Sequence, residues 1–238
     1  MGDLVYLDAR RTPRPRASEL VRPTFFFDLA CPFSYLVAER IERTLGDAEF
    51  VPVTGASLAA RVGSGHELAA LRRQAELRAR QLRLPIVWPD RFPAGVPCAL
   101  RAATFASEIG AGPRFALAAS RLAFCGGFDL DDPETLAEAA AAAGLPLDAC
   151  LEAAGDPGLD EAPLLAAGEL RARGVVTVPA IDVGGRLFGG EAGLLAAAPG
   201  ACGPSPPDRA RLATPPAARL LPWPIPSTGS DPSRRARR

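Results

Sequence analysis

The stretch that decides the fold is residues 24–35, which read TFFFDLACPFSY. Residues 24–29 form a short aromatic run, which indicates a fully buried strand. A turn at residues 30–32 leads into residues 34–46, where apolar side chains recur at helical spacing and a final glycine ends the segment. Residues 49–53 then indicate a second strand. A strand, a helix and a second strand within about 30 residues form a βαβ unit.

The pattern is helical from about residue 67 to residue 173 and then changes again. Residues 178–183 and 186–188 indicate two short strands. They meet at Gly184-Gly185 in a tight hairpin, because glycine tolerates the positive φ that such turns require. A last helix over residues 191–198 closes the body of the chain. Within the helical stretch, we expect helices at 68–82, 98–107, 113–124, 133–143, 147–154 and 163–173.

The composition excludes several kinds of enzyme. The chain has 238 residues, 48% of them hydrophobic, so it can form a sizeable core. All 27 basic residues are Arg, and 27 acidic residues balance them. Without Lys there is no Schiff-base chemistry and no P-loop phosphate clamp, and the single His66 excludes a centre of several histidines.

The five cysteines are too far apart in sequence for a CxxC pair or a zinc knuckle. We therefore expect no metal and no disulfide framework. The N-terminus has no secretory pattern, and no apolar run of about 18 residues follows it. We expect a cytoplasmic protein with reduced thiols. The cysteines are Cys31, Cys98, Cys125, Cys150 and Cys202.

Charge and proline divide the chain into three parts. Residues 1–22 are expected to be a flexible N-terminal arm. Residues 199–238, which contain ten Pro and seven Arg, are expected to be a disordered tail. Residues 23–198 contain 15 Arg and 22 acidic residues, so the folded body is acidic. The helical insertion within it is expected at about residues 60–173.

Cys31 is the one cysteine that the sequence marks as reactive. It stands between a buried strand and the first turn of a helix, where unpaired N–H groups and the helix dipole favour a thiolate. We therefore expect its pKa to be lowered. Cys98, Cys125 and Cys150 lie among apolar residues and are expected to be small buried hydrophobic side chains, while Cys202 falls in the tail.

The second informative position is Val178-Pro179. A proline at the head of a strand donates no hydrogen bond to a neighbouring strand, so it is unfavourable unless the chain uses that position specifically. A cis Val178-Pro179 bond is such a use, because it leaves the carbonyl and the N–H group of Val178 free to pair with an extended ligand backbone.

Taken together, these motifs resemble the DsbA-like superfamily of thioredoxin folds. They are the strand-CPFS-helix at residues 31–34, the segment 174–180, the glycine-rich turn 184–190 and the Arg-Phe-Pro at 91–93 before a helix. The chain is most similar to the branch that holds 2-hydroxychromene-2-carboxylate isomerases and kappa-class glutathione transferases. The resemblance covers residues 23–198. It implies an α/β, thioredoxin-like fold with a long all-helical insertion, plus disordered N- and C-terminal tails.

The resemblance also implies roles for single residues. Cys31 occupies the reactive site at the helix start, which is the first Cys of CxxC in oxidoreductase members and a Ser that activates the glutathione thiol in isomerase and kappa members. Ser34 falls where a resolving Cys would be, and Pro179 matches the cis-proline that faces the active site. The expected catalytic residues are Cys31 and Ser34, and the expected substrate-binding residues are Pro32, Phe33, Val178 and Pro179.

The chain also departs from the family in three places. A CxxS motif has no internal partner, so Cys31 can form a mixed disulfide only with glutathione or a protein and then needs an outside thiol. An Asp-Arg pair that holds the γ-glutamyl end of glutathione in the isomerase-like branch is replaced by residues 191–193, which read EAG. The Asn that often follows Phe-Pro is replaced by residues 94–96, which read AGV.

Three functions follow from the sequence. The first is a thiol-dependent oxidoreductase that uses Cys31 as a single nucleophile. The second is a glutathione-dependent isomerase or transferase of the 2-hydroxychromene-2-carboxylate isomerase type. The third is a non-catalytic thioredoxin-fold binding protein. We expect a small-molecule or thiol substrate, glutathione as a co-substrate, and no metal, nucleic-acid or membrane partner; a homodimer is left open.

Overall fold

The computed structural model of the chain describes residues 22–55 and 65–198. The two terminal segments expected at 1–22 and 199–238 lie outside the described residues except for Arg22, and Cys202 lies outside them as well. In the described ranges, no helix is long and apolar enough to span a bilayer.

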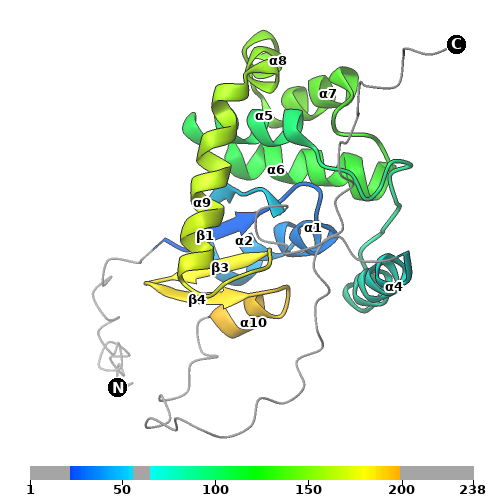
Figure 1. The fold of residues 1–238 in the computed structure, drawn as a ribbon, viewed down its shortest axis with the longest axis vertical. Helices are drawn as coiled ribbons and strands as arrows, with labels where there is room; N and C mark the ends of the chain where they lie inside the picture. The colour runs from blue at the N-terminus through cyan, green and yellow to red at the C-terminus, as the bar shows by residue number, and fades with distance from the viewer. Residues whose placement is uncertain (1–21, 56–64, 199–238) are drawn as a thin grey trace, which may run out of the picture.

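A four-stranded mixed sheet forms the centre of the molecule (Figure 1). The strand order is β2-β1-β3-β4. β1 pairs in parallel with β2 and antiparallel with β3, and β3 and β4 form the expected hairpin, in which both Gly184 and Gly185 have positive φ. The strands are β1 at Thr24–Phe27, β2 at Glu49–Pro52, β3 at Ala180–Val183 and β4 at Arg186–Gly189.

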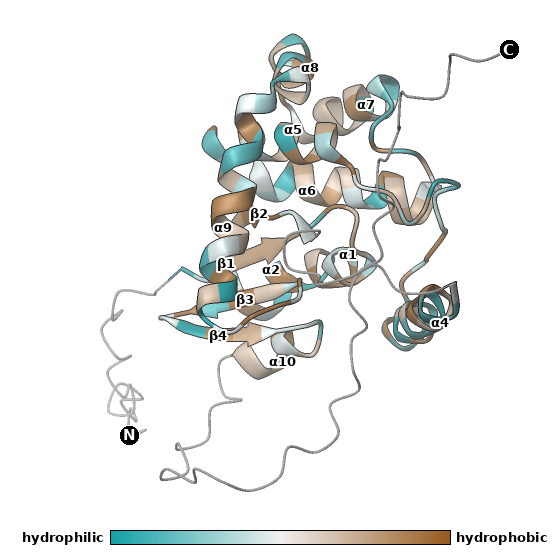
Figure 2. Cartoon of the chain, viewed as in Figure 1, coloured by the Kyte–Doolittle hydropathy of each residue, from teal (hydrophilic) through white to brown (hydrophobic). Residues whose placement is uncertain are grey.

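The aromatic residues of β1 point alternately to the two faces of the sheet. Phe25 and Phe27 enter the main hydrophobic core, where their rings lie 5.0 and 5.8 Å from the ring of Phe50. Phe26 faces the other way, is half-buried, and packs in a second cluster with Leu170. Successive side chains of a strand point to opposite faces, so this one strand contributes to both layers of the core. Figure 2 shows its hydrophobic character.

The helix expected at residues 34–46 is two helices in the structure. α1 spans Pro32–Ala38 and α2 spans Ile41–Leu45. The break falls at Arg40, whose φ of −127° is not helical and whose side chain is paired with Glu191 far along the chain. Helical spacing alone did not reveal this break, because the apolar residues keep their helical spacing across it.

All the remaining helices except the last lie between β2 and β3, as the sequence predicts. The expected helix over 113–124 ends earlier and continues as a short π-helical segment, η2. Asp132 caps α7, since its side chain accepts from the N–H of Glu134. The elements are α4 at Gly65–Leu82, α5 at Pro97–Glu108, α6 at Gly112–Arg121, η2 at Leu122–Gly126, α7 at Pro133–Ala143, α8 at Leu147–Gly155, the 3-10 helix η3 at Pro157–Asp160 and α9 at Glu161–Ala172.

Most helices of the insertion gather above the sheet, and the last one leads the chain back to β3. α5, α6, α7 and α8 lie above the sheet in Figure 1, and α9 runs down from them along the strands. α10, at Gly193–Ala197, packs against β3 and β4. α4 stands apart from the other helices of the insertion. It contacts the segment 88–92 through Arg72 and Glu76, and it also has contacts with the thioredoxin core.

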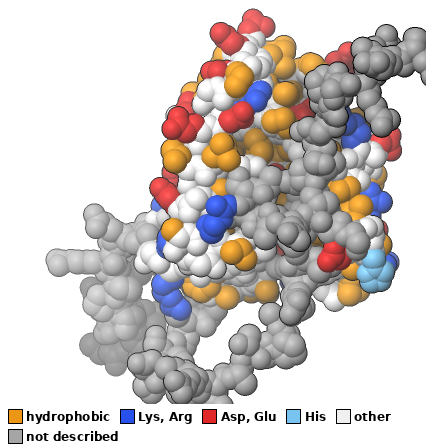
Figure 3. Space-filling model, in the orientation of Figure 1, with side chains coloured by type: hydrophobic (Ala, Val, Ile, Leu, Met, Phe, Trp, Pro, Cys, Tyr) orange, Lys and Arg blue, Asp and Glu red, His pale blue; other side chains and the backbone are white. Residues whose placement is uncertain are grey.

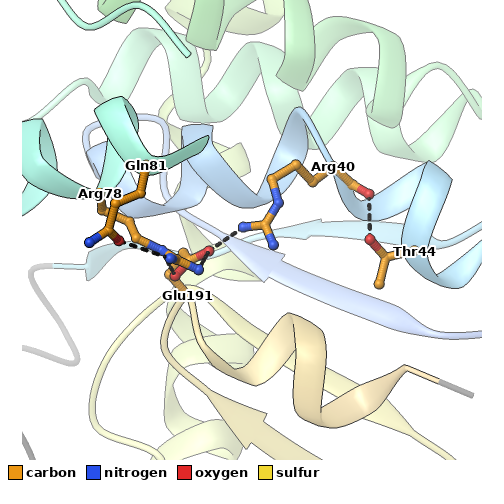
Figure 4. A network of polar contacts seen from close by, with 5 residues as sticks. All are labelled: Arg40, Thr44, Arg78, Gln81 and Glu191. Carbon is orange, nitrogen blue, oxygen red and sulfur yellow. Dashed lines mark hydrogen bonds and ion pairs between the residues drawn. The ribbon is translucent and has the colours of Figure 1, made fainter. Parts of the chain in front are cut away.

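One buried carboxylate supplies such a contact (Figure 4). Glu191 follows β4, and its side chain is only 8% exposed. It pairs with Arg40 after α1 and with Arg78 of α4, whose Nε and Nη2 donate to the two oxygens at 2.6 and 3.1 Å. The hydroxyl of Thr44 donates to the carbonyl of Arg40 and keeps that residue in place. The network therefore ties α4 to two segments of the thioredoxin core: a residue between α1 and α2, and the residues that follow β4.

The Glu191→Ala substitution should destabilise the fold strongly, because it leaves two guanidinium groups without their carboxylate in a site with little water. We expect a loss of about 3–5 kcal/mol in the free energy of unfolding, measured by urea denaturation. The matched control is Asp47→Ala, which removes the exposed ion pair with Arg22 and should cost less than about 1 kcal/mol. Equal losses in the two variants would contradict this role for Glu191.

Candidate active site

Cys31 and Val178 meet at one edge of the sheet. Cys31 is the N-cap of α1, directly after β1, and Val178 lies just before β3. The Sγ atom of Cys31 lies 3.6 Å from the carbonyl oxygen of Val178. The Val178-Pro179 bond is cis, as the sequence predicts, and so is Phe92-Pro93, which was not predicted. The edge at the carboxyl ends of β1 and β2 is where open α/β sheets bind their ligands.

The thiol of Cys31 is buried, with 5% of the residue exposed. Burial raises the pKa of Cys31 to about 11. The N–H group and the hydroxyl of Ser34 and the N–H group of Phe33 act in the opposite direction, while the nearby charge of Asp28 raises the pKa further. The expectation of a lowered pKa is therefore wrong for this state. The helix start does favour the thiolate, but the loss of solvent outweighs it.

Four of the expected site residues come together. Ser34 is 1% exposed and its hydroxyl oxygen accepts from the N–H of Asp28 at 3.2 Å, which leaves its proton free for the sulfur of Cys31. Val178 and Pro179 face that sulfur from the other side, and the carbonyl of Pro179 accepts from the N–H of Gly190 at 2.7 Å.

Pro32 and Phe33 occupy the first turn of α1 and both are buried. Phe33 packs within the main hydrophobic core. Their side chains therefore support the helix start in this state, and the role in substrate binding that the resemblance implies stays a prediction.

Asp28 is a site residue that the sequence analysis did not identify. Its carboxylate accepts from the N–H of Ala30 at 2.8 Å and from the N–H of Gly55, in the segment after β2. A Cβ atom on Gly55 would collide with that carboxylate, so the close approach requires glycine. Burial raises the pKa of Asp28 to about 6, against the effect of the two N–H donors. The available signal was an acidic residue interrupting an apolar strand.

A cavity of about 280 Å³ opens beside this turn. It lies between the β1–α1 turn, the segment after β2, the start of α5, and the η3–α9 region. Its walls are mostly apolar, with two carboxylates among them. The lining residues are Asp28, Ala30, Thr54, Gly95, Val96, Pro97, Leu100, Asp160, Pro163 and Leu164.

The other described thiols belong to the helical insertion, on α5, η2 and α8. Cys150 is buried, and Cys98 and Cys125 are half-buried. Burial raises the pKa of Cys98 and Cys150. Cys125 lies in η2 with its sulfur 3.2 Å from the hydroxyl of Tyr35, which donates to the carbonyl of Pro85. Within residues 22–55 and 65–198, no three His, Cys, Asp or Glu side chains gather to hold a metal ion.

The family model of the DSBA-like thioredoxin domain matches residues 24–197. The chain belongs to this family. The expected fold and family are thereby confirmed. No sequence among the curated proteins matches the chain.

Solved structures of the same fold agree with this assignment. The chain is similar to a 2-hydroxychromene-2-carboxylate isomerase, at 16% identity and a TM-score of 0.62, covering 71% of this chain and 89% of that one. It is equally similar to a probable DsbA oxidoreductase from Streptomyces coelicolor, at 19% identity and a TM-score of 0.62, covering 82% and 97%. The chain is also similar to the cytosolic disulfide reductase DsbM from Pseudomonas aeruginosa with GSH, at 20% identity and a TM-score of 0.50, covering 70% of this chain and 87% of that one. Membership of the family supports an enzyme of the oxidoreductase or isomerase type.

The reactivity of Cys31 should rise steeply with pH. With a pKa of about 11, only about one thiol in ten thousand is ionised at pH 7. The rate of iodoacetamide alkylation at Cys31, followed by peptide mapping, should therefore increase about tenfold per pH unit and show no plateau below pH ~10. A plateau near neutral pH would show instead that the helix start dominates over burial.

Asp28 should make stability depend on pH in a defined direction. Its pKa is higher in the folded chain than the ordinary value of 3.8, so ionisation disfavours the folded state as the pH rises from about 4 to about 6. In the Asp28→Asn variant this penalty is absent. The free energy of unfolding of the variant, relative to the unsubstituted chain, should therefore rise by about 2 kcal/mol between pH 4 and pH 7. A constant difference across that range would contradict the assignment.

Proposed function

We propose that the protein is a thiol-dependent oxidoreductase in which Cys31 is the only nucleophile and glutathione is the second thiol. The observation that carries the proposal is the position of Cys31. Its sulfur lies between the N–H groups that begin α1 and the carbonyl of Val178, 3.6 Å away. A disulfide substrate that pairs its backbone with Val178 would present its sulfur directly to this atom.

The reaction is an exchange of disulfide bonds. The Cys31 thiol releases its proton to solvent, and the thiolate attacks one sulfur of a substrate disulfide. An S–S bond forms between Cys31 and that sulfur, while the other substrate sulfur leaves as a thiolate and takes up a proton. A glutathione thiolate then attacks the bound substrate sulfur and releases Cys31, which is reprotonated. The N–H groups of Phe33 and Ser34 and the Ser34 hydroxyl stabilise the sulfur anion in both steps.

The raised pKa supports the reducing direction. A thiolate of high pKa is a poor leaving group, so the mixed disulfide on Cys31 is a weak oxidant, and the attack of glutathione that releases Cys31 is expected to be the slow step of the cycle. Because Ser34 replaces the resolving cysteine, the chain has no internal thiol at that position to complete an oxidase cycle. The protein therefore takes up half of a disulfide rather than delivering a disulfide to another protein.

Glutathione as the second thiol is supported by charge near the site. Two guanidinium groups share the single carboxylate of Glu191, so this cluster has a net positive charge. It adjoins Gly190, whose N–H group holds the carbonyl of Pro179. Arg78 is 29% exposed and can reach a carboxylate of glutathione. In this proposal, Arg78 takes over the role of the Asp-Arg pair that the isomerase-like branch has in place of residues 191–193. The DsbM structure with GSH has the same fold.

The proposal places the chain in the cytoplasm, where glutathione keeps thiols reduced. In its support, all four cysteines of the described residues are free thiols. The substrate is a small disulfide or a thiol compound, with neither nucleic acid nor membrane as partner.

A second candidate is a glutathione-dependent isomerase, favoured by the same raised pKa. A thiol that stays protonated at neutral pH can donate its hydrogen to the thiolate of bound glutathione. Cys31 would then be a hydrogen-bond donor, as the Ser of the isomerase members is, and would form no covalent bond.

Mass spectrometry after exposure to oxidised glutathione tests the first candidate. We expect a glutathione adduct on Cys31 that forms about tenfold faster per pH unit between pH 7 and pH 9. Cys98→Ser and Cys125→Ser are the matched controls, because they remove the half-buried thiols and should leave the adduct unchanged. Adducts only on Cys98 or Cys125 would overturn the proposal.

The Cys31→Ser variant separates the two candidates. The oxidoreductase should lose all disulfide exchange, because a hydroxyl forms no disulfide. The isomerase should retain glutathione binding and turnover, because a Ser hydroxyl donates at least as well as a thiol. Calorimetry with reduced glutathione and a disulfide-exchange assay on the same variant give the two readouts.

A further inference from the structure

We propose that the cavity beside the β1–α1 turn binds an apolar group that carries a protonated amine, and that it excludes carboxylates. We call it the Asp28 cavity, lined by the ten residues given above. The inference rests on the proposed function, because it names the part of the substrate that lies next to Cys31.

The Asp28 cavity is placed to receive a substrate of Cys31. Ala30, the residue before Cys31, forms part of its wall, and so does Thr54, two residues after the end of β2. Both residues lie at the sheet edge that holds Val178. A volume of about 280 Å³ is at the lower end of the range for small-molecule sites, so it fits one ring or a short branched chain.

The walls of the cavity are mainly apolar. Val96, Pro97 and Leu100 come from the start of α5, and Pro163 and Leu164 come from α9. Leu164 is 50% exposed, so the cavity opens to solvent along α9. Figure 3 shows hydrophobic and acidic side chains, side by side, over this helix. An apolar group that entered here would remove both its own surface and that of Leu164 from water.

The charge of the cavity comes from one carboxylate. Asp160 is neutralised by Arg101, whose Nε and Nη2 donate to its two oxygens at 2.7 and 2.8 Å. Among the described residues, no Arg pairs with Asp28, which accepts only from the backbone N–H groups of Ala30 and Gly55. An ionised carboxylate has about four lone-pair sites, so Asp28 can accept further hydrogen bonds from a ligand.

This arrangement selects the sign of the ligand. A protonated amine at Asp28 forms a charge-assisted hydrogen bond to a residue that is only 4% exposed, and such bonds are strong where the partner is buried. A carboxylate at the same place would meet a like charge with no cation to compensate it. The Asp28 cavity therefore favours amine-bearing disulfides and disfavours acidic aromatic substrates.

Titration with two probes of the same shape tests the inference. Benzylamine and benzoate share a phenyl ring and differ in charge, and their binding to the full-length Cys31→Ser chain can be followed by calorimetry or by NMR. We expect benzylamine to bind at least about tenfold more tightly than benzoate at pH 7.5. Equal affinities, tighter benzoate, or no binding of either probe would overturn the inference.

Two neighbouring leucines provide a matched pair of variants. Leu164→Lys places a cation at the cavity wall and should weaken benzylamine binding several-fold. Leu165→Lys places the same charge one residue away, on a side chain that is 61% exposed and does not line the cavity, and should leave the affinity unchanged. Equal effects would mean that only overall charge matters and would overturn the inference. Asp28→Asn should abolish the preference for the amine, and Leu164→Lys keeps the test valid if that variant does not fold.

The probes distinguish this inference from the proposed function. Benzylamine binding to the Cys31→Ser chain needs no thiol chemistry. If the amine binds but Cys31 forms no adduct with oxidised glutathione, the inference holds and the proposed function fails. If Cys31 forms the adduct but the amine does not bind, the inference alone fails.

Discussion

The sulfur of Cys31 is held at a place where two opposing effects act on one atom. The first turn of α1 directs N–H groups and a hydroxyl toward it, and the carbonyl of Val178 lies opposite. The packing that fixes this geometry also removes water, and water is what an anion needs most. In the free chain the loss of water dominates. The thiol is therefore neutral until a substrate changes its surroundings.

The same constraint acts on Asp28, three residues earlier in the turn. Its carboxylate fastens the turn to the segment after β2 through Ala30 and Gly55, so it cannot leave without loosening the site. The charge of Asp28 opposes a charge on Cys31. The two groups thus share one buried region, in which the negative charge of one disfavours a negative charge on the other. A cation bound near Asp28 would offset its charge and would therefore lower the pKa of Cys31.

The meeting of Cys31 with Val178-Pro179 was implied by the family resemblance, while local patterns in the sequence were sufficient to predict β1, the hairpin and the insertion. They failed where distant residues decide. The helix expected over 34–46 breaks at Arg40, whose side chain pairs with Glu191, 151 positions away. The pKa of Cys31 depends on how much of the fold covers it, and a helix-start argument contains no such information. Asp28 was missed because its partner Gly55 lies in the segment after β2, 27 positions away along the chain.

Glu191 has one further consequence for the sheet edge. Its carboxylate joins α4 to the residue that follows Gly190, and Gly190 in turn holds Pro179. A displacement of α4 must therefore break two charged hydrogen bonds or else drag that turn along with it. The backbone that would pair with a substrate is thus linked to a helix of the insertion through one carboxylate and one backbone hydrogen bond.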